Sequence, residues 1–416
     1  MLTISNIRKE QHDEWIRLVV DIDFGDIETP FLEKTIYFAV KNENADMLTD
    51  ETYDAFVLIP LYLAMYFQTD LHICGKISKQ LYQNIKWYIQ QILCDFSDEL
   101  TKVNLIVDGF TSIKERGTLI GAGISCGVDS LSTIYDHFIN EKDPEYRINS
   151  LFIFNCGTHG DYENPASHQL FEKRYELNKK AADELKLPVF QVSSNVHAFT
   201  HKIGEQKMGY FAICSCIYSL QKKIKKYYIS SSNSYQEIKE FSQSEHNFDL
   251  FVFSESYLVP LLQTEHMQLV IDGCQYQRSK KTENIADWEI AQRHLNVCVN
   301  TTDGINCCIC SKCMRTLVVL EILGKLDKFG RVFDIEKYRK HAYKAKCVMV
   351  AGYRKNNFYT DNVNFARAHN YPMPSWFIAQ SYKMLCCGGV LVSAKHVLRA
   401  LIGEEKYLKL KHKIRG

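Results

Sequence analysis

The residues whose types and spacing most clearly suit ligand binding are Ser-Cys-Gly-Val-Asp-Ser at positions 125–130. An apolar run at 119–124 predicts a buried strand before them, and apolar residues at 131, 134, 135 and 138 predict a helix after them. A strand, a turn of small residues and a helix together direct backbone N–H groups at an anion. Gly127 allows a ligand to approach the backbone closely, and the hydroxyl groups of Ser125 and Ser130 add donors. Asp129 would repel a phosphate unless a cation lay between them, so the combination indicates nucleotide phosphates with a divalent cation.

These residues resemble the PP-loop signature, Ser-Gly-Gly-x-Asp-Ser, of the ATP pyrophosphatase superfamily, with Cys126 in place of the first glycine. Members of that superfamily cleave ATP between its α and β phosphates and adenylate a substrate oxygen. The resemblance implies an α/β fold of the adenine nucleotide α-hydrolase-like (HUP) type, a parallel sheet with helices on both faces. It also implies that ATP contacts the whole loop, namely Ser125, Cys126, Gly127, Val128, Asp129 and Ser130. A turn of small residues also occurs as a plain βα connection, so the motif needs support from elsewhere in the chain.

Further strands are expected at 150–155, 189–193 and 227–233, with helical patterns between them. This alternation favours a parallel sheet with right-handed crossovers, in which ligands bind outside the carboxyl ends of the strands. We therefore expect adenine to lie against the end of the second strand, at Phe154, Asn155 and Cys156. His159 follows in the next loop and is a candidate for contact with an acceptor substrate, or simply a surface histidine.

A second group of residues with metal-binding chemistry lies further along the chain, at Cys298, Cys307, Cys310 and Cys313. Four thiolates that converge in a polar loop are the ligand set that tetrahedral Zn²⁺ requires. An iron–sulfur cluster is the alternative, since it uses the same ligands. Cys308 breaks the spacing of three and is expected to point away from the metal.

The spacing Cys-x8-Cys-x2-Cys-x2-Cys after a PP-loop is similar to that of 7-cyano-7-deazaguanine synthase, and the resemblance covers about residues 118–320. In that family the four cysteines hold zinc beside the active site, and a lysine precedes the helix that leads to them. Lys281 matches that lysine, with Lys280 as the alternative because the spacing differs by one residue. Residues 306–316 also resemble the zinc loop of longer bacterial PP-loop proteins, to which muropeptide glutamate epimerases are related.

Length and composition indicate the organisation of the chain. Its 416 residues predict an N-terminal α+β domain at 1–115, a catalytic domain with the zinc loop (298–315) at 116–325, and a mostly helical extension at 326–416. A net charge of +1 argues against a nucleic-acid partner. The chain opens without a signal-peptide pattern, and its longest apolar run, 56–67, is too short to span a bilayer, so we expect a cytoplasmic protein with reduced thiols. The basic end, 406–416, could contact an anionic membrane, but a solvated helix is the simpler interpretation.

The resemblance implies a mechanism in which Asp129, Ser130 and Lys281 are catalytic, Mg²⁺ bridges Asp129 and the phosphates, and Lys281 neutralises the leaving pyrophosphate. A carboxylate or amide oxygen of a small molecule or conjugate would attack the α phosphorus, and ammonia or an amine would then displace AMP, as in a C–N bond-forming ligase. Arg278 and Arg315 are expected to border the acceptor site. Two other functions stay open, an adenylation-dependent epimerase with His159 or His197 as base, and a nucleotide-binding module without turnover. The oligomeric state is also open, a homodimer included.

Overall fold

The computed structural model describes residues 1–111, 117–203, 205–242, 251–300 and 304–386. Its residues group into two compact units, Met1–Ile305 and Asn306–Gly416. The first unit contains all the strands found among the described residues, and the second is helical over its described part.

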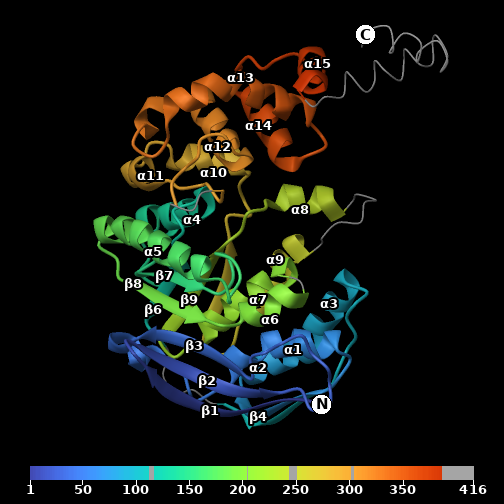
Figure 1. The fold of residues 1–416 in the computed structure, drawn as a ribbon. Coiled ribbons are helices and arrows are strands. Elements are labelled where there is room, and N and C mark those ends of the chain that lie inside the picture. The colour runs from blue at the N-terminus through green and yellow to red at the C-terminus, as the bar shows by residue number, and fades with distance from the viewer. Residues whose placement is uncertain (112–116, 204, 243–250, 301–303, 387–416) are drawn as a thin grey trace, which may run out of the picture. The chain divides into compact units, whose positions relative to one another are not determined.

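The first unit is built on a ten-stranded sheet with the order β10-β9-β6-β7-β8-β3-β2-β1-β4-β5 (Figure 1). Its strands are β1 (Leu2–His12), β2 (Trp15–Asp23), β3 (Thr35–Lys41), β4 (Leu71–Ile77), β5 (Leu105–Phe110), β6 (Leu119–Gly123), β7 (Ser150–Asn155), β8 (Val189–Ser194), β9 (Ile224–Ser230) and β10 (Gln268–Asp272). Neighbouring strands are parallel except at three places, where β3 pairs with β8, β2 with β3, and β1 with β2. The sheet is therefore mostly parallel, and β6 is the middle strand of the parallel group β10-β9-β6-β7-β8.

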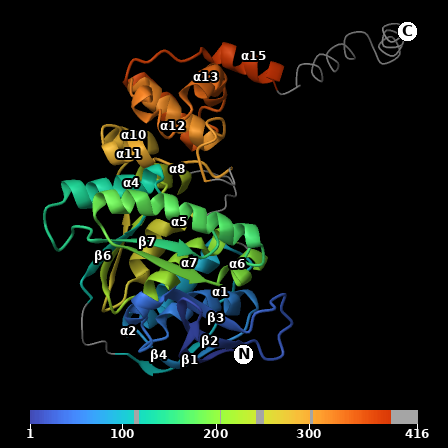
Figure 2. The ribbon, with the colours of Figure 1, turned by 60° about the vertical axis from the view of Figure 1, so that its left-hand side comes forward.

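Side chains of the parallel strands alternate between two apolar cores, one on each face of the sheet. Tyr227 packs into one core and its neighbour Tyr228 into the other, and Phe152 and Leu151 divide in the same way. The helices that accompany these strands are α4 (Val128–Ile134), α5 (Pro165–Leu185), α6 (His197–Ile203), α7 (Glu205–Tyr218), α8 (Tyr235–Ser242), α9 (Phe251–Leu258), α10 (Arg278–Ile285) and α11 (Glu289–His294). Residues of α4 and α5 belong to the Tyr228 core, and residues of α6 and α7 to the Tyr227 core (Figure 2). The predicted α/β class, with a mostly parallel sheet and helices, is confirmed, whereas the specific PP-loop fold stays a prediction.

Residues 1–110 extend the same sheet. Strand β3 pairs with β8 at Phe38↔Ser194 and Ala39↔Ser193. The side chain of Asn195 prolongs this pairing, because its Oδ1 accepts from Tyr37 N at 2.9 Å and its Nδ2 donates to the carbonyl of Thr35 at 2.8 Å. Short helices pack on this part of the sheet, including α1 (Leu58–Tyr66), α2 (Lys79–Asn84) and α3 (Gln90–Phe96).

The second unit consists of α12 (Ser311–Ile322), α13 (Ile335–Ala351), α14 (Asn357–Ala368) and α15 (Trp376–Cys386), with a short 3₁₀ turn at Leu326–Phe329. Asp334 and Asn356 cap α13 and α14 by accepting from the backbone N–H groups of Lys337 and Tyr359. The basic segment 406–416 lies outside the described residues. No helix in the described part of the chain is long and apolar enough to cross a membrane.

The two compact units do not coincide with the three predicted domains. Residues 1–110 share a sheet and a core with the strands that follow, and the change of unit falls at 305/306. The domain boundaries near 115 and 325 stay a prediction.

Candidate functional site

The loop between β6 and α4 contains a left-handed residue, and that residue is Cys126, with φ of +53°. This is the position where the PP-loop signature has its first glycine, and Gly127 itself has φ of −75°. The side chain of Cys126 is buried, which raises the pKa of its thiol to about 12. Its carbonyl accepts from Asn296 N at 2.7 Å. The thiol of Cys126 is therefore neutral and structural. Its left-handed backbone conformation costs about 1 kcal/mol for a residue other than glycine.

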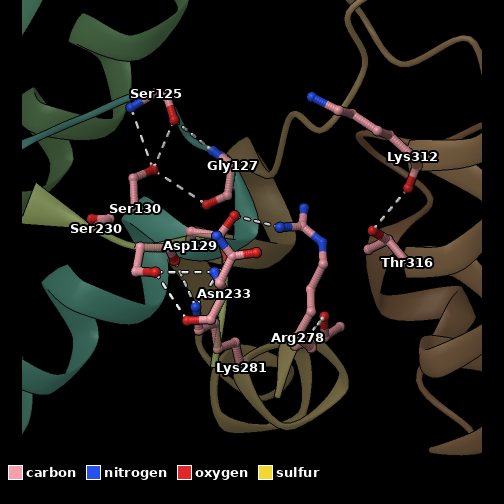
Figure 3. A network of polar contacts seen from close by, with 12 residues as sticks. Ser125, Gly127, Asp129, Ser130, Ser230, Asn233, Arg278, Lys281, Lys312 and Thr316 are labelled. Atoms are coloured by element: carbon pink, nitrogen blue, oxygen red, sulfur yellow. Dashed lines mark hydrogen bonds and ion pairs between the residues drawn. The ribbon is translucent and has the colours of Figure 1, made fainter. Parts of the chain in front are cut away.

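The two predicted serines close the loop on itself (Figure 3). Their Oγ atoms are 3.0 Å apart, Ser130 Oγ donates to the carbonyl of Gly127 at 3.2 Å, and Gly127 N donates to Ser125 Oγ at 3.3 Å. These hydroxyl groups satisfy one another, and each can rotate its proton towards a ligand.

Asp129, in the first turn of α4, lies between two cations from α10. Lys281 Nζ donates to Asp129 Oδ1 at 3.3 Å, and the guanidinium of Arg278 donates to Oδ2. Arg278 and Lys281 are three residues apart on one helix and so face the same side. Burial raises the pKa of Asp129, but the charges of Arg278 and Lys281 outweigh it, and the pKa is lowered. The carboxylate is therefore ionised at neutral pH.

Of the two candidate lysines, Lys281 is the one at this loop. Its side chain is fully buried, and its Nζ also donates to the carbonyl of Ser231 at 2.7 Å. Gly273, with φ of +85°, makes room for it, because a Cβ there would lie 3.1 Å from Lys281 Nζ. Lys280 is half-exposed and pairs with Glu283 at 2.8 Å.

The carboxyl ends of β9 and β10 supply further polar groups beside the loop. Asp272 accepts from Thr133 Oγ1 at 2.7 Å and lies 2.9 Å from His137 Nε2. These contacts join the end of β10 to α4 and to the π-helical segment Tyr135–Asn140 that continues it. Asn233 Nδ2 donates to Glu255 Oε1 at 3.2 Å. The sequence marked the end of β9 as polar but gave no signal for Asp272 or Glu255, because neither lies in a motif.

The residues predicted to contact adenine lie mostly inside the protein. Asn155 and Cys156 are buried. Phe154 packs against Tyr227, with ring centroids 6.0 Å apart. A ligand at this strand end would therefore meet backbone atoms more than side chains, and the adenine contact stays a prediction.

The two candidate bases are neutral histidines. Burial, with a smaller effect of Arg174, lowers the pKa of His159 to about 4, and its ring lies edge-on to Phe171 at 5.2 Å. Burial, with nearby histidines, lowers the pKa of His197 to about 3. Imidazoles with such pKa values bind a proton weakly at neutral pH.

The four predicted metal ligands come together. The Sγ atoms of Cys298, Cys307, Cys310 and Cys313 lie within 4.8 Å of one another. The distance between Cys307 Sγ and Cys313 Sγ is 3.9 Å, close to the separation of about 3.8 Å expected for sulfurs around tetrahedral Zn²⁺. This group could hold a metal ion such as zinc.

Backbone N–H groups support the cysteine cluster. Cys310 N donates to Cys307 Sγ at 3.3 Å, and Cys313 N donates to Cys310 Sγ at 3.5 Å at the start of α12. Such contacts favour the thiolate form that a metal requires. Cys308 points elsewhere, since its Sγ accepts from Asp334 N at 3.2 Å, as its break in spacing predicted.

Arg315 makes its described contacts within the second unit. Its guanidinium lies over the ring of Phe358 at 3.8 Å, and its carbonyl accepts from Asn362 Nδ2 at 2.7 Å, so it packs against α14. Its contact with an acceptor stays a prediction.

Comparisons with protein-family models, with curated proteins and with solved structures found no match. The geometry itself therefore carries the functional argument. Three features support that argument: a mostly parallel sheet in an α/β fold, a hydroxyl-lined loop after the middle strand of its parallel group, and a cysteine cluster.

Proposed function

We propose that the protein is an ATP-dependent adenylating enzyme of the PP-loop type, which converts ATP to AMP and pyrophosphate. One observation carries the proposal: Asp129, in the first turn of α4 beyond the carboxyl end of β6, lies between two cations, Arg278 and Lys281. A carboxylate and two cations beside a loop of hydroxyl and N–H donors suit a nucleoside triphosphate bound together with a divalent cation.

Three residues of the loop then have a role in binding phosphate. Ser125, Gly127 and Ser130 would turn their donors from one another towards phosphate oxygens. Lys281 is held by Ser231 and would stabilise the negative charge of the leaving pyrophosphate.

Mg²⁺ fits this site only after a rearrangement. Both oxygens of Asp129 are engaged by cations, so the carboxylate would become a metal ligand once Arg278 turned towards the phosphates. When bound, Mg²⁺ would neutralise phosphate charge.

The acceptor is proposed to be a carboxylate or amide oxygen of a small molecule or conjugate, with ammonia or an amine as the second nucleophile, as the likeness to 7-cyano-7-deazaguanine synthase suggests. The alternative, an epimerase, needs a base strong enough to remove an α-proton. His159 and His197 are poorly suited to that task because of their lowered pKa values. The ligase is therefore preferred.

The metal is proposed to be zinc with a structural role. Four cysteines fill a tetrahedral shell and leave no position for a substrate or water. An iron–sulfur cluster is the competing occupant, and metal analysis separates the two.

The proposal is tested by comparing Lys281→Ala with Lys280→Ala in the presence of ATP, Mg²⁺ and candidate carboxylates. Pyrophosphate release should fall by roughly a hundredfold or more in Lys281→Ala, because the pyrophosphate loses its cation. Lys280→Ala should behave as the wild type, since Lys280 pairs with Glu283 on the surface. Equal rates in both variants would contradict the proposed site.

A further inference from the structure

Glu255, on α9, carries a fully buried carboxyl group beside the turn that follows β9. Its Oε1 is hydrogen-bonded to Ser231 Oγ and accepts from Asn233 Nδ2 at 3.2 Å. Its Oε2 is buried and has no hydrogen-bond partner among the described residues. Burying a carboxyl group with one oxygen unpartnered is costly, which indicates that the group has a role.

Ser231 links this carboxyl group to the proposed phosphate site. The carbonyl of Ser231 accepts from Lys281 Nζ at 2.7 Å, and its N–H donates to the carbonyl of Asp272 at 2.8 Å. The same residue therefore contacts Glu255 through its side chain and Lys281 through its backbone. A change at Glu255 would move the acceptor that holds Lys281.

The hydrogen-bond pattern indicates that Glu255 is a neutral acid. Ser231 Oγ accepts from Asn233 N at 3.0 Å, and its single hydroxyl proton has two oxygens in reach, the carbonyl of Asn233 at 2.9 Å and Glu255 Oε1. A proton on Glu255 satisfies both contacts, because Glu255 then donates to Ser231 Oγ and Ser231 donates to Asn233. An ionised carboxylate would instead leave negative charge on the unpartnered Oε2. Consistently, burial raises the pKa of Glu255 to about 8, although the charge of Lys281 and a hydrogen bond from the backbone of Asn233 act to lower it.

We propose that Glu255 is a positioning residue, which as a neutral acid holds Ser231 against Lys281 and leaves the positive charge of Lys281 available to bound phosphates. The inference rests on the proposed function, because it takes those phosphates to be the phosphates of ATP. At neutral pH the site then contains Asp129, Arg278 and Lys281, and its net charge is positive. Ionisation of Glu255 would cancel that charge.

The groups that act on Glu255 electrostatically are Lys281 from α10, Asp129 from α4 and Cys274 from the segment after β10. Helix α7, which packs against α9, contributes the buried groups Cys214, Cys216 and Tyr218. Burial raises the pKa of each of these thiols and of the phenol, so they stay neutral between pH 7 and about 9. Among these groups, Glu255 is the one expected to change charge in that range.

The first test measures the position of Lys281 without any nucleotide. The full-length wild type, Glu255→Ala and Glu255→Gln are treated with acetic anhydride, and acetylation of Lys281 is followed by peptide mass. Glu237→Ala is the matched control, because Glu237 is also buried and accepts from Ser234 N at 2.7 Å to cap α8. Lys281 should react roughly tenfold faster in Glu255→Ala and stay protected in the other three proteins. Equal protection in Glu255→Ala would overturn the positioning role.

The second test measures MgATP affinity at pH 7 and pH 9 by calorimetry. The wild type should bind several-fold more weakly at pH 9, because ionised Glu255 then offsets the charge of Lys281, whereas Glu255→Gln should lose no affinity. The same loss in both proteins would overturn the neutral-acid role, even if Glu255→Ala did not fold. If the wild type bound no MgATP at either pH, the proposed function would fail, and the acetylation result would still decide whether Glu255 positions Lys281.

Discussion

Arg278 and Asp129 form an ion pair in which the guanidinium of Arg278 donates to Asp129 Oδ2. Arg278 is the first residue of α10, whereas Lys281, the second partner of Asp129, is fully buried and held by Ser231. Both cations are buried, but Arg278 lies at the helix end and keeps 10% of its side chain exposed against 1% for Lys281, so Arg278 is the one that we expect to turn away. In the resting protein Arg278 occupies the side of Asp129 that a divalent cation would need.

Arg278→Gln should lower the Mg²⁺ concentration that half-saturates pyrophosphate release, because no cation then competes for Asp129 Oδ2. We expect a shift of about threefold to tenfold, with a lower maximal rate, since the phosphates also lose a positive charge. A magnesium titration at fixed ATP measures both quantities, and Lys280→Gln controls for the loss of charge on the same helix. An unchanged magnesium dependence would show that Arg278 does not restrict Asp129.

Asp129 should also contribute to stability in a pH-dependent way. Its pKa in the folded protein is lowered, so its contribution is present above its ordinary pKa of about 4 and is lost as the pH falls through the lowered folded value. At pH 7, Asp129→Asn should reduce the free energy of unfolding by about 2–3 kcal/mol, because two buried cations lose their partner. Urea denaturation at several pH values should show this difference shrinking below about pH 4. A difference that did not depend on pH would contradict the ion-pair explanation.

Cys126→Ala should retain activity, although the residue lies in the proposed ATP-binding loop. Its thiol is buried and its pKa is raised to about 12, so it is no nucleophile. Cys126→Val should lose at least about 2 kcal/mol of stability, because a β-branched residue fits a φ of +53° poorly. Denaturation and pyrophosphate assays on both variants check this. An inactive but folded Cys126→Ala would point to a chemical role for the thiol.

Metal binding should depend on Cys310 and be independent of its neighbour Cys308. Cys310→Ser removes one of four clustered sulfurs and should lose the metal, with a loss of several kcal/mol of stability. Cys308→Ser is the matched control, since Cys308 Sγ contacts Asp334 N outside the cluster. Elemental analysis of protein purified without added metal should find about one zinc per chain in the wild type and in Cys308→Ser. Finding iron, together with visible absorbance, would show that the cysteines hold an iron–sulfur cluster and not zinc.

The features that could be predicted from the sequence are those confined to short stretches. Residues 119–134 form the expected strand, turn and helix, because apolar periodicity and small residues act over a few positions. The cysteine cluster was predictable for the same reason, since its four members lie within 298–313.

Contacts between distant parts of the chain were not predictable from one sequence. The pairing of β3 with β8 is prolonged by Asn195, which bonds to the backbone of Thr35 and Tyr37, and nothing near either segment indicates this pairing. Glu255 reaches the site through Ser231, on a different element. Gly273 could be assigned a function only once Lys281 was seen to fill the space beside it.

The products formed from ATP test the central claim most directly. The wild-type protein is incubated with ATP, Mg²⁺ and a panel of carboxylates with ammonia, and the phosphorus-containing products are identified by ³¹P NMR. The proposed chemistry predicts AMP and pyrophosphate in equal amounts with the right acceptor, and no turnover by folded Asp129→Ala, because the loop then lacks its carboxylate. Release of ADP and phosphate by the wild type would contradict it.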